Sequence, residues 1–346
     1  MRIDHRKVAV AVAVICLAAA LAGCSDGGSN PPPSPPAPPS PPPPPPPASV
    51  EREISPALAN PALTANLAAN FVINPNPAVS AKNRLFVMLP GTGAIPRTYR
   101  EIVRVGAARG YHALGLTYPN DEAIETLCGG NPIPDCAGLA RREVIMGEPV
   151  STLVNVDAPN SITGRLTSLL TYLSATFPAE GWGQYLVNGQ VNWSLVTVAG
   201  HSQGSGHAGY LAKIRDLNRA VMFSGPGDTG ATAGSSADWL SLPNFTGVAR
   251  QFGFTHTADP LAPLPNVLRN WGVIDLDLFG APVSVDGAAA PYNNAHQLVT
   301  SAPPNPNPAG PSAAPEHGAP VVDSVTPRDA QGNPLYRDVW IYLAFP

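Results

Sequence analysis

The sequence predicts an α/β fold built on a mostly parallel sheet. Short apolar runs typical of buried strands alternate with segments whose apolar residues recur at helical spacing. Hydrophobic residues make up 44% of the chain, which is ordinary for a globular protein, whereas only 13% of the residues are charged. Residues 51–346 follow a proline-rich segment and provide enough chain for one large domain.

The first expected strand lies at residues 83–90, where the apolar run NRLFVMLP ends in a turn. A helix at 99–108 is expected to stop at Gly110, and the run YHALGLTYP predicts the next strand at 111–119. Residues 120–150 lack a clear period and are interpreted as irregular.

A helix is expected at 161–177, because apolar residues recur there every three or four positions and Pro178 supplies a stop. Helices should cover both faces of the sheet, and the long segments 226–246 and 281–315 should form loops at its carboxyl edge. The remaining expected elements are strands at 193–199, 219–223, 248–254 and 297–300, and helices at 203–214 and 335–345.

The N-terminus has the pattern of an export signal. A positively charged start precedes an apolar run at 8–22. Residues 21–24, Leu-Ala-Gly-Cys, resemble the lipobox of bacterial lipoproteins, which implies cleavage after residue 23, lipidation of Cys24 and contact with a lipid bilayer. Ser25, where Asp would favour inner-membrane retention, implies an outer-membrane or cell-surface location. The alternatives are an ordinary secretory signal and a small uncleaved anchor.

A tether follows the lipidation signal. Fourteen prolines fall within residues 31–47, and polyproline II of that length reaches roughly 50 Å. A ligand for a proline-recognition domain is the alternative interpretation. The predicted organisation is therefore a signal peptide at 1–23, a lipidated cysteine with its tether at 24–50, and one domain at 51–346.

Two cysteines remain for the folded domain, Cys128 and Cys136. An exported chain meets an oxidising compartment, so we expect them to form a disulfide. A two-cysteine metal site is the alternative, but it lacks nearby histidines. No metal-ligand cluster or phosphate loop is evident, so no cofactor is expected. A net charge of −4 without a basic patch argues against nucleic-acid binding.

One motif carries a chemical signal, Gly200-His201-Ser202-Gln203-Gly204, of the form G-x-S-x-G. An apolar strand leads into it and a segment rich in small residues follows, which is the context of a nucleophile elbow. The tight turn would expose the serine at the carboxyl edge of the sheet. With this motif, residues 80–346 resemble the α/β-hydrolase family, in the form common among esterases and lipases.

The resemblance implies a triad in the order serine, acid, histidine. Asp259 follows the second expected strand after Ser202, and His317 follows the last strand. Asp259 could also be a simple helix cap. The second-choice triad members are Asp228, one strand earlier, and His296, at the start of the last strand.

Each role has a chemical reason. Serine is a weak nucleophile, so an imidazole must take its proton, and a carboxylate must hold that imidazole in one tautomer. The oxyanion needs preorganised donors. The backbone N–H of Gln203 should be one, and the loop after the first strong strand should supply the other, from Thr92 or next from Gly91. Pro90 stands where this family commonly has histidine.

The expected function is hydrolysis of carboxylic esters, of a size that the sequence does not define, through an acyl-enzyme. The first alternative is a catalytically silent α/β-hydrolase fold that serves as a surface binding protein. A peptidase or thioesterase with the same triad is the second, because the choice of leaving group depends on the shape of the pocket.

Overall fold

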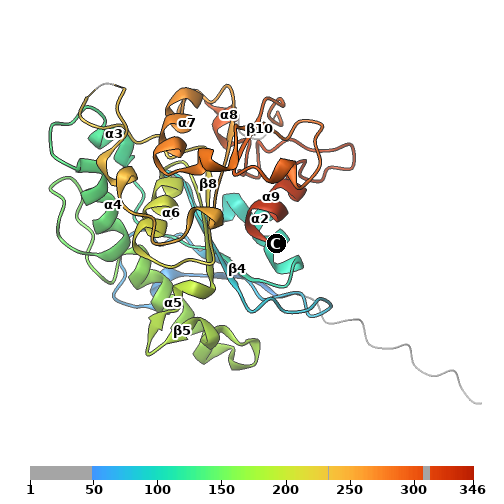
Figure 1. Ribbon diagram of the computed structural model, residues 1–346. Helices are drawn as coiled ribbons and strands as arrows, with labels where there is room; N and C mark the ends of the chain where they lie inside the picture. Colours follow the sequence, from blue (N-terminus) through green and yellow to red (C-terminus); the bar gives the residue numbers. More distant parts are fainter. Residues whose placement is uncertain (1–48, 233, 307–311) are drawn as a thin grey trace, which may run out of the picture. The chain divides into compact units, whose positions relative to one another are not determined.

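A nine-stranded sheet forms the centre of the computed structural model, which describes residues 49–232, 234–306 and 312–346 (Figure 1). The strand order is β1-β2-β4-β3-β7-β8-β9-β11-β10. All pairs from β4 to β10 are parallel, whereas β2 pairs antiparallel with both β1 and β4. The prediction of an α/β fold with a mostly parallel sheet is confirmed.

The elements have the following bounds. The strands of the sheet are β1 (Glu51–Ile54), β2 (Asn70–Ile73), β3 (Leu85–Leu89), β4 (His112–Gly115), β7 (Val196–His201), β8 (Arg219–Phe223), β9 (Gln251–His256), β10 (Val283–Ser284) and β11 (Gln297–Thr300), and β5 (Leu186–Val187) with β6 (Gln190–Val191) forms a separate hairpin. The helices are α1 (Pro56–Ala59), α2 (Arg100–Ala108), α3 (Ile124–Cys128), α4 (Cys136–Met146), α5 (Ile162–Thr176), α6 (Gln203–Ile214), α7 (Leu264–Val273), α8 (Pro315–Gly318) and α9 (Arg337–Ala344).

The sheet separates two hydrophobic cores, because successive side chains of a strand point to opposite faces. Strand β3 shows this directly. Leu85, Val87 and Leu89 join the core that α4, α5 and α6 cover, whereas Phe86 and Met88 join the core that α2 and α9 cover. Figure 1 shows these two groups of helices on opposite sides of the sheet. Both faces of β3 are fully buried, which explains its continuous apolar run.

Helix α5 illustrates how the local sequence sets an element. The Ser161 side chain accepts a hydrogen bond from the N–H of Gly164 at the start of the helix. The helix ends at Thr176, two residues before Pro178, close to the stop that the sequence predicts. The apolar residues at helical spacing, Leu166, Leu169, Leu170 and Leu173, are all buried.

Residues 120–150 correct one expectation, because they contain two helices, α3 and α4, rather than irregular chain. Helix α4 buries Arg141 and Glu143 together with its apolar residues. Since buried positions normally carry apolar side chains, these charges hide the helical period in the sequence. Elements β1, β2 and α7 also went unpredicted, and β9 begins at Gln251 rather than at residue 248.

All described residues belong to one compact unit, Pro46–Pro346. Within the described ranges, no helix combines the length and the apolar character needed to span a bilayer. Cys24 and the expected tether at 31–47 lie outside those ranges. The carboxyl ends of the parallel strands meet at one edge of the sheet, and the segments that follow β3, β7, β9 and β11 gather there.

Candidate active site

Ser202 occupies a strained turn between β7 and α6. Its φ of 55° and ψ of −121° lie outside the regions that residues other than glycine prefer. The two flanking glycines make this turn possible. A Cβ on Gly200 would overlap the backbone carbonyl of Gly204, and a Cβ on Gly204 would overlap that of Leu89 in the neighbouring strand. The spacing G-x-S-x-G is therefore a steric requirement of this turn.

Asp259 and His317 form a buried pair. His317 Nδ1 lies 2.7 Å from one carboxylate oxygen of Asp259 and 3.0 Å from the other. The backbone N–H groups of Leu261 and Ala262 both donate to Asp259 Oδ1, at 2.9 Å, and hold the carboxylate in place. Asp259 follows β9 and His317 lies in α8, 58 residues later. The structure thus brings together the acid and the imidazole that the sequence pairs.

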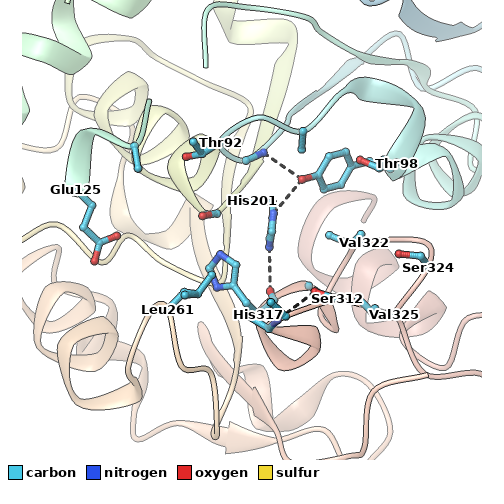
Figure 2. Close-up of a pocket in the computed structure, with 18 of the residues that line it drawn as sticks. Thr92, Thr98, Glu125, His201, Leu261, Ser312, His317, Val322, Ser324 and Val325 are labelled. Atoms are coloured by element: carbon cyan, nitrogen blue, oxygen red, sulfur yellow. Dashed lines mark hydrogen bonds between the residues drawn. The ribbon is translucent and has the colours of Figure 1, made fainter. Parts of the chain in front are cut away.

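Ser202 and His317 line the same pocket, which has a volume of about 580 Å³ (Figure 2). The Asp259 carboxylate occupies Nδ1 of His317 and leaves Nε2 as the ring nitrogen able to accept a proton. The other lining residues used below are Thr92, Glu125, Leu261, Val322 and Val325.

The loop after β3 is tied to the turn at Ser202 by Gln203. Its side-chain oxygen accepts hydrogen bonds from Thr92 Oγ1 at 3.3 Å and from the N–H of Ile124 at 3.0 Å. Within the described residues, the backbone N–H groups of Thr92 and Gln203 have no acceptor. The N–H of Gly91 instead donates to the Tyr99 hydroxyl at 3.1 Å. Of the two loop candidates, Thr92 is therefore the one with a free donor, and Gly91 is engaged.

The second-choice triad members lie elsewhere. Asp228 forms a buried ion pair with Arg141 and accepts a hydrogen bond from Trp239 Nε1 at 2.7 Å. His296 is stacked on Phe279, with ring centroids 3.6 Å apart, and its Nδ1 contacts the carbonyl of Gln251. Neither residue lines the pocket that holds Ser202.

His201, the variable residue of the motif, has a positioning role that the sequence did not reveal. Its Nδ1 lies 2.9 Å from the Tyr99 hydroxyl, and its Nε2 lies 2.9 Å from the backbone carbonyl of His317. Burial, and after it the charge of His317, lowers the pKa of His201 to about 3, so the ring is neutral. Since a carbonyl can only accept, Nε2 carries the proton and Nδ1 accepts from Tyr99.

These contacts form a continuous series of hydrogen bonds from the loop after β3 to His317. The Gly91 N–H donates to Tyr99, Tyr99 donates to His201, and His201 donates to the carbonyl of His317 (Figure 2). Ser224 Oγ also donates to that carbonyl, at 2.7 Å. No short motif contains Tyr99, so only the tertiary structure could identify it.

Arg141 supports the elbow from beneath. Its Nη1 donates to the carbonyl of Gln203 at 3.0 Å, and its other nitrogens pair with Asp228. A Cβ on Gly206 would overlap the guanidinium group, so this glycine makes room for the buried cation. Asp228, which was the second choice for the triad acid, is instead the counter-ion of Arg141.

The predicted disulfide is confirmed. Cys128 ends α3 and Cys136 begins α4, and a disulfide joins them with a Cα–Cα distance of 5.5 Å. In the described ranges, no three His, Cys, Asp or Glu residues lie close enough together to hold a metal ion.

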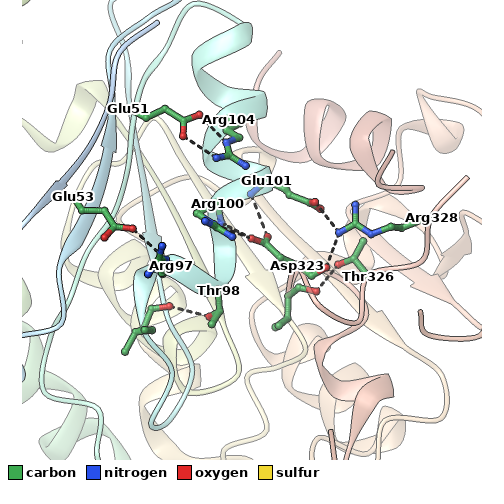
Figure 3. Close-up of polar contacts among 12 residues, drawn as sticks. Glu51, Glu53, Arg97, Thr98, Arg100, Glu101, Arg104, Asp323, Thr326 and Arg328 are labelled. Atoms are coloured by element: carbon green, nitrogen blue, oxygen red, sulfur yellow. Dashed lines mark hydrogen bonds and ion pairs between the residues drawn. The ribbon is translucent and has the colours of Figure 1, made fainter. Parts of the chain in front are cut away.

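The pocket wall that carries Val322 and Val325 is anchored to α2 by Asp323 (Figure 3). The Asp323 carboxylate accepts hydrogen bonds from the first two N–H groups of the helix, those of Arg100 at 3.0 Å and Glu101 at 3.2 Å. A carboxylate at this end of a helix satisfies N–H groups that have no partner within the helix. Arg328 completes the anchor by donating to the Asp323 carbonyl and to Glu101.

No family model matches the chain, and no curated protein is significantly similar to it. The function therefore has to be argued from the site itself.

Replacing Asp323 with alanine should lower the free energy of unfolding by about 1–2 kcal/mol, because two N–H groups of α2 lose their acceptor. Urea unfolding followed by circular dichroism measures the change. Asp338→Ala is the matched control, since Asp338 also lies in the first turn of a helix but its side chain is 74% exposed. Equal effects of the two substitutions would contradict the anchoring role.

Replacing Tyr99 with phenylalanine should lower the free energy of unfolding by about 1–3 kcal/mol, because the buried N–H of Gly91 and Nδ1 of His201 both lose their partner. Thermal unfolding provides the measurement. Tyr172→Phe is the control, because the Tyr172 hydroxyl makes no hydrogen bond within the described residues and its loss should change stability by less than about 0.5 kcal/mol. A Tyr99→Phe protein as stable as the control would argue against the hydrogen-bonded chain.

Proposed function

We propose that the chain is a serine hydrolase of the α/β-hydrolase fold that cleaves carboxylic esters. The observation that carries the proposal is the buried Asp259–His317 pair, whose imidazole lines the same pocket as Ser202 in its elbow conformation. A serine, an imidazole and a carboxylate in this relation are the parts that nucleophilic acyl transfer needs.

The reaction follows from the position of each group. His317 Nε2 takes the proton of Ser202 as its oxygen attacks the ester carbonyl, and Asp259 stabilises the imidazolium through Nδ1–H. The free N–H groups of Gln203 and Thr92 stabilise the oxyanion. The proton then passes from His317 to the leaving alcohol, which gives an acyl-enzyme. Water, activated by the same imidazole, releases the acid and restores the serine.

The order of the elements supports the choice of fold. The serine follows β7, the acid follows β9 two strands later along the chain, and the histidine follows β11. These are the positions that the α/β-hydrolase family uses for its triad. The antiparallel β1 and β2 extend the parallel sheet at one edge.

The location belongs to the same proposal. The signal pattern at 1–23, the lipobox cysteine Cys24 and the proline-rich tether place the hydrolase at the bacterial envelope, attached to a lipid bilayer. The Cys128–Cys136 disulfide supports export, because such bonds form and persist in oxidising compartments.

Ser202→Ala should abolish ester hydrolysis and labelling by a fluorophosphonate probe while leaving the fold intact. The assay is hydrolysis of p-nitrophenyl esters of graded chain length by protein that lacks residues 1–48. The control is Ser194→Ala, because Ser194 lies at the surface and contacts only Asn192 through its side chain. A wild type that neither turns over nor reacts with the probe would favour a silent binding protein.

Asp259→Asn should lower kcat by about 10³–10⁴-fold, because the amide no longer holds His317 in the required tautomer. The comparison with Asp228→Asn separates the two acids. Asp228 pairs with Arg141, so its loss should appear as reduced stability, with activity retained in the fraction that stays folded. A large loss of kcat in folded Asp228→Asn together with an active Asp259→Asn would reverse the assignment.

A further inference from the structure

The pocket around Ser202 has two chemically different sides. Val322 and Val325 line one side, and Glu125 lines the other (Figure 2). In this view, the side chains of His201 and His317 lie between the valines and Glu125. Glu125 is the one carboxylate among the described lining residues, and none of them is a lysine or an arginine. An ester at Ser202 therefore meets an apolar wall on one side and an acidic group on the other.

The position of Glu125 is built into the fold. Glu125 lies in α3, whose last residue, Cys128, is joined by the disulfide to Cys136. The first residue of that helix, Ile124, donates its N–H to Gln203, the residue after the nucleophile. Gly227 leaves the space that the carboxylate fills, since a Cβ there would come within 2.5 Å of Glu125 Oε1. These contacts hold the carboxylate in the pocket that Ser202 also lines.

Within the described residues, the Glu125 carboxylate has no hydrogen-bond donor and no ion-pair partner. The charged groups that face it are Asp228, Asp259 and Arg141. Arg141 is fully engaged, because its nitrogens pair with Asp228 and with the carbonyl of Gln203. Burial, then the charge of Asp228, raises the pKa of Glu125 to about 7. A cation in the pocket would supply the missing partner and favour the charged carboxylate.

We propose that Glu125 determines substrate specificity by binding a cationic group, such as an ammonium, on one side of the scissile ester. The inference rests on the proposed esterase function and names the class of substrate, an ester with a positive charge on one side and a small apolar group on the other. The cation need not enter the chemical step, since its attraction to Glu125 orients the ester carbonyl over Ser202.

Two pairs of esters that differ only in charge test the proposal. Acetylcholine and 3,3-dimethylbutyl acetate place the charge on the alcohol side, and p-nitrophenyl 6-aminohexanoate and p-nitrophenyl heptanoate place it on the acyl side. In at least one pair, the wild type should prefer the cationic ester about tenfold in kcat/KM at pH 8, which corresponds to about 1.4 kcal/mol. Glu125→Gln should bring that ratio close to one, because the amide carries no charge.

The pH dependence of the kcat/KM ratio provides a second test of the role of Glu125. Both cations stay charged between pH 6 and 8, so a change in the ratio across this range reports a change of charge on the protein. Because the Glu125 carboxyl gains its charge as the pH rises through about 7, the preference should grow from pH 6 to pH 8. The matched control is Glu122→Gln, which removes a nearby exposed carboxylate and should keep the wild-type ratio.

The inference is overturned if the wild type prefers neither cationic ester, or if the preference persists in Glu125→Gln. Should Glu125→Gln fail to fold, the wild-type ratio decides, and a ratio independent of pH overturns the inference. Failure of the proposed function looks different. The wild type would then turn over none of the four esters faster than Ser202→Ala, whereas equal turnover of the charged and neutral esters would contradict only the role of Glu125.

Discussion

Steric crowding at Ser202 is the constraint from which the rest of the site follows. The backbone there reverses between a buried strand and a buried helix, with φ at 55°, and packs so closely on Leu89 of the neighbouring strand that only glycine fits at position 204. Such a turn persists only where its surroundings enforce it. Here β3 and β8 flank β7, and Arg141 holds the carbonyl of Gln203 from below. The sheet and its contacts thus fix the position of Ser202.

The remaining groups come from distant parts of the chain, and hydrogen bonds bring them to the serine. Asp259 and His317 follow strands on one side of β7, while Thr92 follows β3 on the other. The Tyr99–His201 contact links these two sides, because His201 reaches the carbonyl of His317 and Tyr99 reaches the N–H of Gly91. A neutral, buried imidazole suits this task, since one nitrogen can accept while the other donates. The same hydrogen-bonded chain therefore fixes both the position of His317 and the position of the loop after β3.

Much of the fold and of the candidate site could be predicted because it is written in local patterns. Strands β8 and β11 lie where their apolar runs predict them, and the elbow motif led by chain order to the Asp259–His317 pair. The failures share a physical cause. Helix α4 hides Arg141 and Glu143 inside the protein, so its pattern contradicts the usual burial rule. Strand β1 carries three charged residues, Glu51, Arg52 and Glu53, among its four positions, so it lacks the apolar run of a strand. Tyr99 and Glu125 gain their roles from contacts that only tertiary folding creates.

The Cys128–Cys136 disulfide, which joins two residues eight positions apart in the chain, also bears on how such a protein could diversify in evolution. The segment from α3 to α4, whose two helices the disulfide joins, contains no strand of the sheet. It contributes Glu125 to the pocket and contains none of Ser202, Asp259 and His317. Exchange of this segment between homologous chains would alter the charge of the pocket, while Ser202, Asp259 and His317 would keep their positions. Selection could then act on substrate preference and on bond-making chemistry as nearly separate traits.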